Sequence, residues 1–463
     1  MSLRPLSPDE WTLETAQHLL NRAAFGGTRE QAQELMFSGR AKSVELLIAG
    51  LVPSGGPDFV NEKPLVADEL ERPAESPGET DSRPDPRAER RRLATERAQR
   101  LHTIQLPWLR RMHTSNAARE KLTLFWHGMV TSGFTKVDNR TLMLAQNARL
   151  RSLSTGDYRV LISELCVDPA MIHYLDIDQN RRTKPNENFA RELLELFTLG
   201  EGNYDDTDIK RLARVFVNLK VDEFPDDMIL DAENLPSISQ SAGFSDRMKA
   251  IRKEIGRIFA KPVCGELLCR RLLRFYLTDE PETRLVKDLN QVLRANQWQV
   301  GPTLSVLFSS QLFYSNEFRG LQIKSPVQFL MKAMIDLKIN MVPEIPAEFA
   351  MSELGQALFN PPNVAGWPGG RTWINSSSLA KRYELMAQLI EVALTEKKGS
   401  ISEDLAALRL IPKSTIDSLI DQWFPHQLPL EKRRLFETLS QSYLESPKKL
   451  LLALAQSPEY QLC

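Results

Sequence analysis

The stretch DDTDIKRLARVFVNL, residues 205–219, contains the pattern that decides the fold. Its apolar residues recur at helical spacing on one face, behind a cap of aspartate and threonine, which is typical of an amphipathic helix. That face consists of Ile209, Leu212, Ala213, Phe216 and Val217. Helical patterns follow one another on both sides of this stretch, with no convincing alternation of a β-strand and no tandem repeat. The sequence therefore predicts an all-α fold, a large array or bundle of helices.

Signals for helix starts are spread along the whole chain. SPDE (7–10) and TREQ (28–31) have the form of capping boxes, with Pro8 at the first helical position. CGELLCRRLLRFYL (264–277) repeats the apolar face, and SPKKLLLALAQSPEY (446–460) begins with a serine cap followed by proline. These motifs predict helices from the first residues to the last.

Two segments interrupt the helical pattern. The segment 53–86 mixes proline with Glu, Asp, Ser and Gly, and it predicts a disordered or extended insertion. NPPNVAGWPGGRTW (360–373) predicts a fixed Pro/Gly-rich loop, because its prolines and glycines prevent regular structure. The breaks predict four parts: N-terminal helices over 1–52, a Pro- and charge-rich insertion or linker over 53–100, a central helical domain with the polar motifs over 101–340, and a C-terminal helical subdomain with the GWPGG loop over 341–463.

The composition is that of a folded soluble protein. The chain has 463 residues, of which 42% are hydrophobic and 26% charged, and 59 Lys+Arg against 60 Asp+Glu give a net charge of -1. This balance gives no general attraction to nucleic acid, and no apolar run reaches the length of a membrane span. With no visible signal peptide, we expect a cytoplasmic protein. The four scattered cysteines predict neither a disulfide framework nor a metal pair.

The most polar helix start lies in PNENFARELLELFTLG, residues 185–200. Its polar residues are Asn186, Glu187, Asn188, Arg191, Glu192 and Glu195. Glu187, Arg191 and Glu195 fall four residues apart on one stripe, so one interpretation is an exposed ladder of ion pairs behind an asparagine cap. The other interpretation is a functional site.

His127 and Asp176 favour the site. His127 follows a strongly apolar run in KLTLFWHGMVTSG (121–133), although a core histidine bonded to a carbonyl would also explain it. Asp176 lies shortly before the polar helix, so we expect it near Glu187. An imidazole with carboxylates suits acid–base chemistry or a divalent metal, and we predict His127, Glu187 and Glu192 as catalytic, with the metal left open. Zinc-ligand spacing, nucleotide-binding loops and a serine elbow are all missing from the sequence.

Six blocks of the sequence resemble, in order, the recurring blocks of the bacterial domain-of-unknown-function family 1800. The blocks are AQHLLNRAAFGGT (16–28), LTLFWHGMVTSG (122–133), DPAMIHYLD (168–176), PNENFARELLELFTLGEGNYDDTDI (185–209), IKSPVQF (323–329) and GQALFNPPNVAGWPGGRTWINSSSLAKR (355–382). The resemblance implies a predominantly helical fold and carries no established activity. Members are often exported and encoded beside a sulfatase-like family, which implies a sulfatase-like partner and a place in the cell envelope or periplasm.

The resemblance also implies which residues belong to the site. By position, the characteristic polar residues of the family fall on His127, Asp176, Asn186, Glu187, Asn188, Arg191, Glu192 and Glu195, and later on Lys324, Trp367, Asn375 and Arg382. From this set we predict substrate binding by Asn186, Asn188, Arg191, Glu195, Asp176, Trp367 and Arg382.

One departure from the family bears on activity. After ARVFVN (213–218), members usually carry a His-Asp-x-Gly-x-Lys stretch, which this chain lacks. Two hypotheses remain: a hydrolase-type enzyme or ligand-binding protein whose Trp-bearing loop covers a polar cleft, or a non-catalytic scaffold whose polar cluster is a structural network. Cofactor, substrate and oligomeric state stay open.

Overall fold

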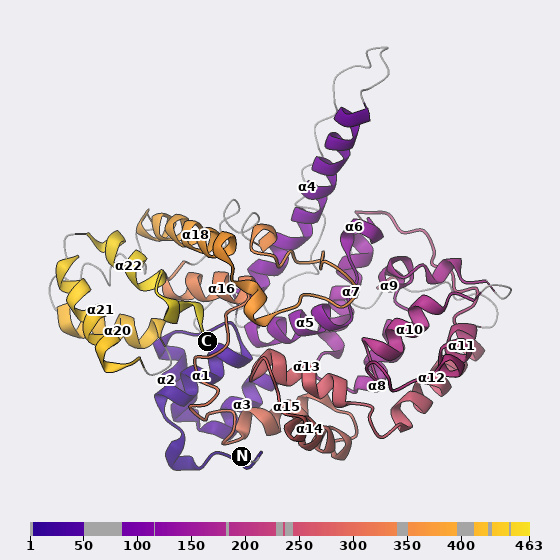
Figure 1. Ribbon diagram of the computed structural model, residues 1–463, viewed down its shortest axis with the longest axis horizontal. Coiled ribbons are helices and arrows are strands. Elements are labelled where there is room, and N and C mark those ends of the chain that lie inside the picture. Colours follow the sequence, from indigo (N-terminus) through magenta and orange to yellow (C-terminus); the bar gives the residue numbers. More distant parts are fainter. Residues whose placement is uncertain are drawn as a thin grey trace.

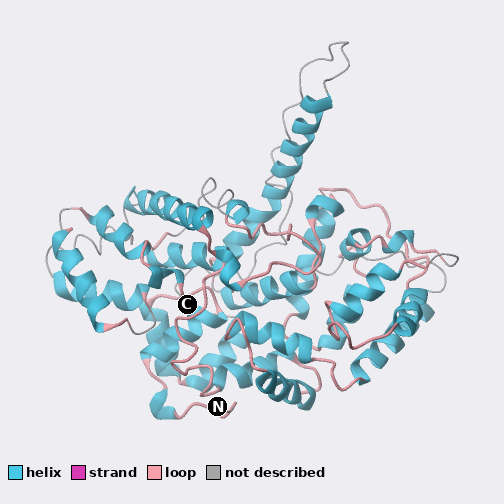
Figure 2. Cartoon of the chain, in the orientation of Figure 1, coloured by secondary structure: helices cyan, strands magenta, loops and turns pink. Residues whose placement is uncertain are grey.

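The protein is described here from a computed structural model covering residues 3–50, 86–114, 116–181, 185–227, 235–236, 244–339, 351–395, 412–424, 428–443 and 446–463. Within these ranges the structure is all α-helical and contains no β-strand, only isolated β-bridges such as Pro5 with Ser310 (Figure 2). The predicted all-α fold is confirmed. The insertion predicted before residue 86 lies outside the described residues.

The first half of the chain builds one edge and the centre of the molecule. Its helices are η1 (Pro8–Glu10), α1 (Leu13–Ala23), α2 (Arg29–Ser38), α3 (Arg40–Ile48), α4 (Pro86–Met112), α5 (Ala117–Met129), α6 (Phe134–Val137), α7 (Arg140–Leu153), α8 (Tyr158–Leu165), α9 (Pro169–Tyr174), η3 (Ile177–Gln179), α10 (Glu187–Glu195) and α11 (Asp206–Val215).

The second half returns across the centre and forms the opposite end. Its helices are α12 (Phe244–Ala260), α13 (Glu266–Tyr276), α14 (Thr283–Ala295), α15 (Val300–Ser309), α16 (Pro326–Asp336), η4 (Gly370–Trp373), α18 (Ser376–Thr395), α20 (Pro412–Trp423), α21 (Leu430–Ser442), α22 (Pro447–Ala455) and η5 (Pro458–Gln461).

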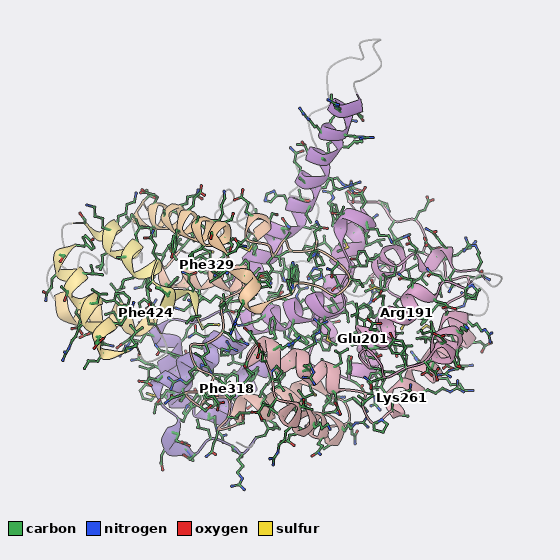
Figure 3. The ribbon with its side chains drawn as sticks, in the orientation of Figure 1. Arg191, Glu201, Lys261, Phe318, Phe329 and Phe424 are labelled. Carbon is green, nitrogen blue, oxygen red and sulfur yellow. The ribbon has the colours of Figure 1, made fainter. Side chains whose placement is uncertain are left out.

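Helix α5 occupies the middle of this arrangement. It packs against α1, α3, α4, α7 and α13, and nearly all of its side chains are buried. Figure 1 shows α8 to α12 on one side of α5 and α18 to α22 on the other. The labelled Arg191 in Figure 3 lies at the first of these ends, and Phe424 lies at the second. A helix that is apolar on all faces is typical of a core helix, so the charged residues that α5 carries need specific partners.

The N-terminal caps follow the sequence signals closely. Thr28 and Gln31 form the predicted reciprocal capping box, and Asp205 accepts the backbone N–H of Asp208 at 2.9 Å. SPDE behaves differently, because Ser7 and Glu10 close only the 3-10 turn η1. Helix α1 starts later, behind Thr12.

Helix α4 projects from the body of the molecule, as Figure 1 shows. Where it meets the body, Arg100 binds Asp138 and Asp226, each at 2.8 Å, and Arg97 pairs with Asp138 at 3.2 Å. Asp226 also accepts from Arg140 at 2.7 Å. These ion pairs fix the base of α4, which runs unbroken through residue 100.

Candidate functional site

His127 lies near the end of α5 in an aromatic enclosure. Its ring centroid is 5.4 Å from Trp108, 5.5 Å from Phe359 and 5.5 Å from Trp367, and only 1% of the residue is exposed. The backbone N–H of Phe359 donates to Nε2 at 3.1 Å, so Nδ1 carries the proton of the neutral ring. The ring therefore accepts from a backbone N–H, whereas the core interpretation from the sequence had it donating to a carbonyl.

Burial also controls the charge of His127. It lowers the pKa of the imidazole to about 3, so the ring is neutral throughout the physiological range. No hydrogen bond, ion pair or ring contact joins His127 to Glu187 or Glu192 among the described residues. Among the predicted site residues, Trp367 is the one whose ring contacts it.

Glu120, one turn from the start of α5, is a buried carboxylate with a complete set of donors. Arg151 donates to both carboxylate oxygens at 2.6 and 2.8 Å, and Trp108 donates its ring N–H at 2.8 Å. Arg111 adds an ion pair at 3.5 Å. Burial raises the pKa of Glu120, but the charges of Arg151 and Arg111 and the hydrogen bonds from Arg151 and Trp108 together outweigh this effect, so the net pKa lies below its usual value. Trp108 thus links this ion pair to the ring of His127.

The polar start of α10 joins this helix to the turn before it. Asn186 caps the helix by accepting the N–H of Asn188 at 3.0 Å. Its own amide donates to the backbone oxygens of Leu175 at 3.2 Å and Asp176 at 3.0 Å. The structure thus brings Asp176 next to the start of α10. The carboxylate of Asp176 pairs with Lys136 at 2.7 Å.

The other polar residues of α10 do not form an ion-pair ladder. Among the described residues, no ion pair joins Glu187, Arg191 and Glu195 to one another, and Glu195 instead accepts from the hydroxyl of Tyr204. Burial and the neighbouring Glu195 raise the pKa of Glu192.

Two of the residues predicted from the later blocks, Lys324 and Arg382, lie in a buried network. The guanidinium of Arg382 donates to the backbone oxygen of Lys324 at 2.7 Å and to Gln461 at 3.4 Å, and it lies 4.9 Å from the ring of Phe329, which is labelled in Figure 3. Asn375 caps α18 by accepting the N–H of Ser378 at 2.9 Å.

A cavity of about 390 Å³ lies between α5, α13, the start of α16 and the loop 367–373, whose last four residues form the 3-10 helix η4. Its volume is in the range of about 300–1,000 Å³ that ligand pockets usually have. Trp367 lines it, and the other residues predicted as catalytic or substrate-binding do not. Five aromatic side chains form part of the wall: Phe25, Phe125, Phe275, Trp367 and Trp373.

Five cationic side chains line the same cavity: Arg22, Lys121, Arg271, Arg274 and Arg371. Arg22 and Lys121 are buried, whereas Arg274 and Arg371 are exposed, so the positive charge extends from the interior to the mouth. None of the five forms an ion pair with a carboxylate in the part of the chain that the structure describes. Burial lowers the pKa of Arg271 and lowers that of Lys121 to about 7.

The five cations differ in how their N–H groups are used. The Lys121 ammonium donates to the backbone oxygens of Asn21 at 3.0 Å and Ala24 at 2.6 Å, and to Gln328 at 2.5 Å. Three acceptors match the three protons of an ammonium, which favours the charged form against the effect of burial.

Arg22 is likewise held by protein atoms, including the backbone oxygen of Tyr276 at 2.9 Å and the side chain of Gln322. By contrast, among the described residues Arg271 makes a single long contact of 3.5 Å to the backbone oxygen of Ala365, and Arg274 uses only Nε, at 3.2 Å from the backbone oxygen of Asp279. The outer guanidinium groups therefore keep free donors.

Two carboxylates, Asp279 and Glu280, lie among these cations in the cavity wall. Burial raises the pKa of Asp279, and nearby Arg22, Arg274 and Arg371 offset this only in part. Gly370 approaches this carboxylate so closely that an added Cβ would lie 2.9 Å from its Oδ2. In the described part of the chain, no group of three or more His, Cys, Asp and Glu side chains is placed to hold a metal ion.

The sequence interpretation missed the cations of the cavity. Lys121, Arg271 and Arg274 stand in strongly apolar helical stretches, where a charge without an obvious partner is unusual. These unpaired charges were the feature of the sequence from which the cavity could have been predicted. Such a feature marks unusual residues on each helix, but it does not show that α5 and α13 face one another.

With this geometry described, the chain can be placed among known proteins. It belongs to the family described as protein of unknown function (DUF1800), whose model matches residues 18–462, nearly the whole chain. This confirms the predicted resemblance. No curated protein and no solved structure was found to match the chain. A search of the described helices finds none that has both the length and the apolar character needed to cross a membrane.

Proposed function

We propose that this protein binds an organic anion in the cavity between α5, α13 and the loop 367–373. The observation that carries the proposal is the set of five cationic side chains around one hollow, none paired with a carboxylate among the described residues. Buried or partly buried charges are normally compensated. Asp279 and Glu280 in the same wall offset only part of the positive charge of the five cations, and an anionic ligand would supply the rest.

The two groups of cations have different roles in this proposal. Lys121 and Arg22 spend their N–H groups on protein oxygens, so they contribute positive potential from the inner end. Within the described part of the chain, Arg271, Arg274 and Arg371 keep N–H groups without a protein acceptor. They would bind the anion directly, because a guanidinium presents paired N–H groups that fit a carboxylate or a similar oxyanion.

The polar residues outside the cavity then have a structural role. His127 is neutral, buried and held by Phe359, and Asn186 connects α10 to the turn at Asp176. These contacts favour the second hypothesis from the sequence for these residues, a buried network that fixes helix packing.

Hydrolysis of the bound anion is a second candidate function, and Asp279 favours it. Its pKa is raised by burial, so it retains a proton to a higher pH than an exposed aspartate, and Glu280 is adjacent in the same wall. A carboxyl group that can donate a proton beside a second carboxylate suits general acid–base chemistry. Such an activity should fall in Asp279→Asn with ligand binding retained.

The direct test of the proposed function is ligand-dependent stability. We would record melting curves with citrate, galacturonate and inositol hexakisphosphate, since a ligand at about 100 times its Kd stabilises the folded state by about 2.7 kcal/mol. The matched variants are Arg371→Gln in the cavity and Arg92→Gln on the projecting helix α4. A rise in Tm that Arg371→Gln loses and Arg92→Gln keeps supports the proposal. Equal responses in all three proteins, or none, overturn it.

The family resemblance adds a proposed partner and compartment. We expect a sulfatase-like protein to associate with this chain in the cell envelope. Co-purification of the two tagged proteins from membrane-associated and cytoplasmic fractions tests both points. Recovery of the chain alone, in the cytoplasmic fraction, would contradict them.

A further inference from the structure

We infer that the ligand of the cavity is an acidic sugar, a pyranose ring that carries a carboxylate or another oxyanion. This inference rests on the proposed function, since it names the chemical class of the anion bound at that site. It draws on three features of the wall besides its charge: the placement of free donors, the aromatic surface and the presence of carboxylates.

The free donors are concentrated in the outer half of the cavity. Arg274 and Arg371 are exposed and Arg271 is half-buried, while the inner cations are occupied by protein oxygens. The oxyanion of the ligand therefore binds near the mouth, and the remainder of the ligand extends along the wall.

That wall is aromatic, with Trp367 in a fixed position. Gly128 on α5 lies under its ring, where an added Cβ would be 3.3 Å from a ring carbon. His127 supports the same indole, with ring centroids 5.5 Å apart. The half-buried Trp367 thus offers ring surface for the apolar face of a sugar, beside polar groups that orient it, while the buried Trp373 contributes a smaller part of the wall.

The carboxylates distinguish a sugar from a polyphosphate. Asp279 and Glu280 would repel a ligand carrying several phosphates, whereas they accept hydrogen bonds from hydroxyl groups. The start of α16 also reaches the cavity, but its first N–H groups are already used. Val327 donates to Gln356 at 3.0 Å, and Gln328 donates to Ser325 at 3.3 Å. The anion site that a helix N-terminus often offers to phosphate is therefore filled by the protein itself.

The experiment compares four probes by calorimetry with the full chain: the disaccharide of galacturonic acid, its dimethyl ester, galactose 6-sulfate and acyclic citrate. We expect the acidic disaccharide to bind at least tenfold more tightly than its uncharged ester and than citrate. Trp367→Leu should weaken the binding of the acidic disaccharide without weakening the binding of citrate. Arg371→Gln should weaken the binding of both. The control Arg92→Gln should change neither.

Each outcome separates the inference from the proposed function. Tighter binding of galactose 6-sulfate than of the disaccharide supports an acidic sugar and assigns the oxyanion as sulfate. Citrate binding that Arg371→Gln abolishes, with no preference for either acidic sugar, overturns the inference and leaves the proposed function standing. Binding of the ester as tight as that of the acid also overturns the inference. If no probe binds, the inference is overturned, and the proposed function then stands only if inositol hexakisphosphate raises the Tm of the parent and not that of Arg371→Gln.

Discussion

The environment of Glu120 and the wall of the cavity are two regions that bring charges together on α5, and they treat those charges in opposite ways. At Glu120 every carboxylate oxygen has donors from Arg151 or Trp108, so the charge is neutralised within the protein. One residue later, Lys121 faces a cavity that also holds Arg22, Arg271, Arg274 and Arg371 without an ion pair among the described residues.

The difference shows that sequence position alone does not determine the role of a charge. Glu120 and Lys121 are neighbours on one buried helix, yet one completes an internal ion pair and the other belongs to an unbalanced group. A compensated buried charge stabilises helix packing, whereas an uncompensated cluster beside open space indicates a binding site. Four predictions test this comparison.

The largest change in the free energy of unfolding is expected when the compensated charge of Glu120 is removed. Glu120→Ala should lower the free energy of unfolding by about 3–5 kcal/mol, because it leaves the Arg151 guanidinium buried without its partner. Urea denaturation measures this change. The matched control is Glu45→Ala, which removes an exposed ion pair with Lys42 at 3.1 Å and should cost at most about 1 kcal/mol. Equal losses in the two variants would contradict the distinction.

A smaller change in the free energy of unfolding is expected when the pH is lowered. The pKa of Glu120 is lower in the folded protein than its usual value of 4.5, so the unfolded state binds more protons as the pH falls through this range. The contribution of Glu120 to stability is therefore full above about pH 4.5 and is lost as the pH falls through the folded pKa. The stability gap between the parent and Glu120→Gln should narrow below pH 4.5, as measured by urea denaturation from pH 6 to pH 3. A constant gap would show that folding does not lower the pKa of Glu120.

The uncompensated charges should matter little for folding. Arg371→Gln should change the free energy of unfolding by no more than about 0.5 kcal/mol, since it breaks no ion pair and lies at the exposed mouth of the cavity. Arg151→Gln is the comparison, with a loss similar to that of Glu120→Ala. If Arg371→Gln destabilised the protein as much as Arg151→Gln, the cavity would be part of the structural frame.

We expect no change in the protonation of the His127 imidazole between pH 5 and pH 8. Its pKa of about 3 keeps the ring neutral there, and the hydrogen bond from Phe359 selects the form with the proton on Nδ1. Nitrogen NMR shifts of the labelled histidine report both properties. In the urea-unfolded protein the same ring should titrate near about 6.5. A folded-state titration in this range would restore His127 as an acid–base candidate.

Much of the fold could be predicted from the sequence, because local signals specify it. The Thr28–Gln31 box and the Asp205 cap lie where the sequence predicts them, since a cap depends on residues only three positions apart. SPDE was misleading, because the same local geometry also closes a single 3-10 turn.

The cavity was harder to predict, because it depends on contacts distant in sequence. Arg22, Arg274 and Arg371 lie far apart in the sequence, and their meeting depends on how α1, α13 and the loop pack around α5. Trp367 was predicted for substrate binding, and it lines the cavity, because a tryptophan in a Pro/Gly-rich loop needs a wall. Hydrophobic periodicity gives the buried face of each helix and leaves its partner unspecified.

The close approach of the loop to α5 has a consequence for how the cavity could vary in evolution or by design. Gly366 lies with φ +83°, and a Cβ there would be 2.0 Å from the backbone oxygen of Gly128. Any side chain at this position would push the whole loop outward, carrying Trp367 and Arg371 with it. The distance between the loop and α5 is therefore limited by backbone contact between two glycines, whereas the side chains that line the cavity can change around them. The selectivity of the cavity for its ligand can therefore change through these side chains, while the backbone contact between Gly366 and Gly128 stays the same.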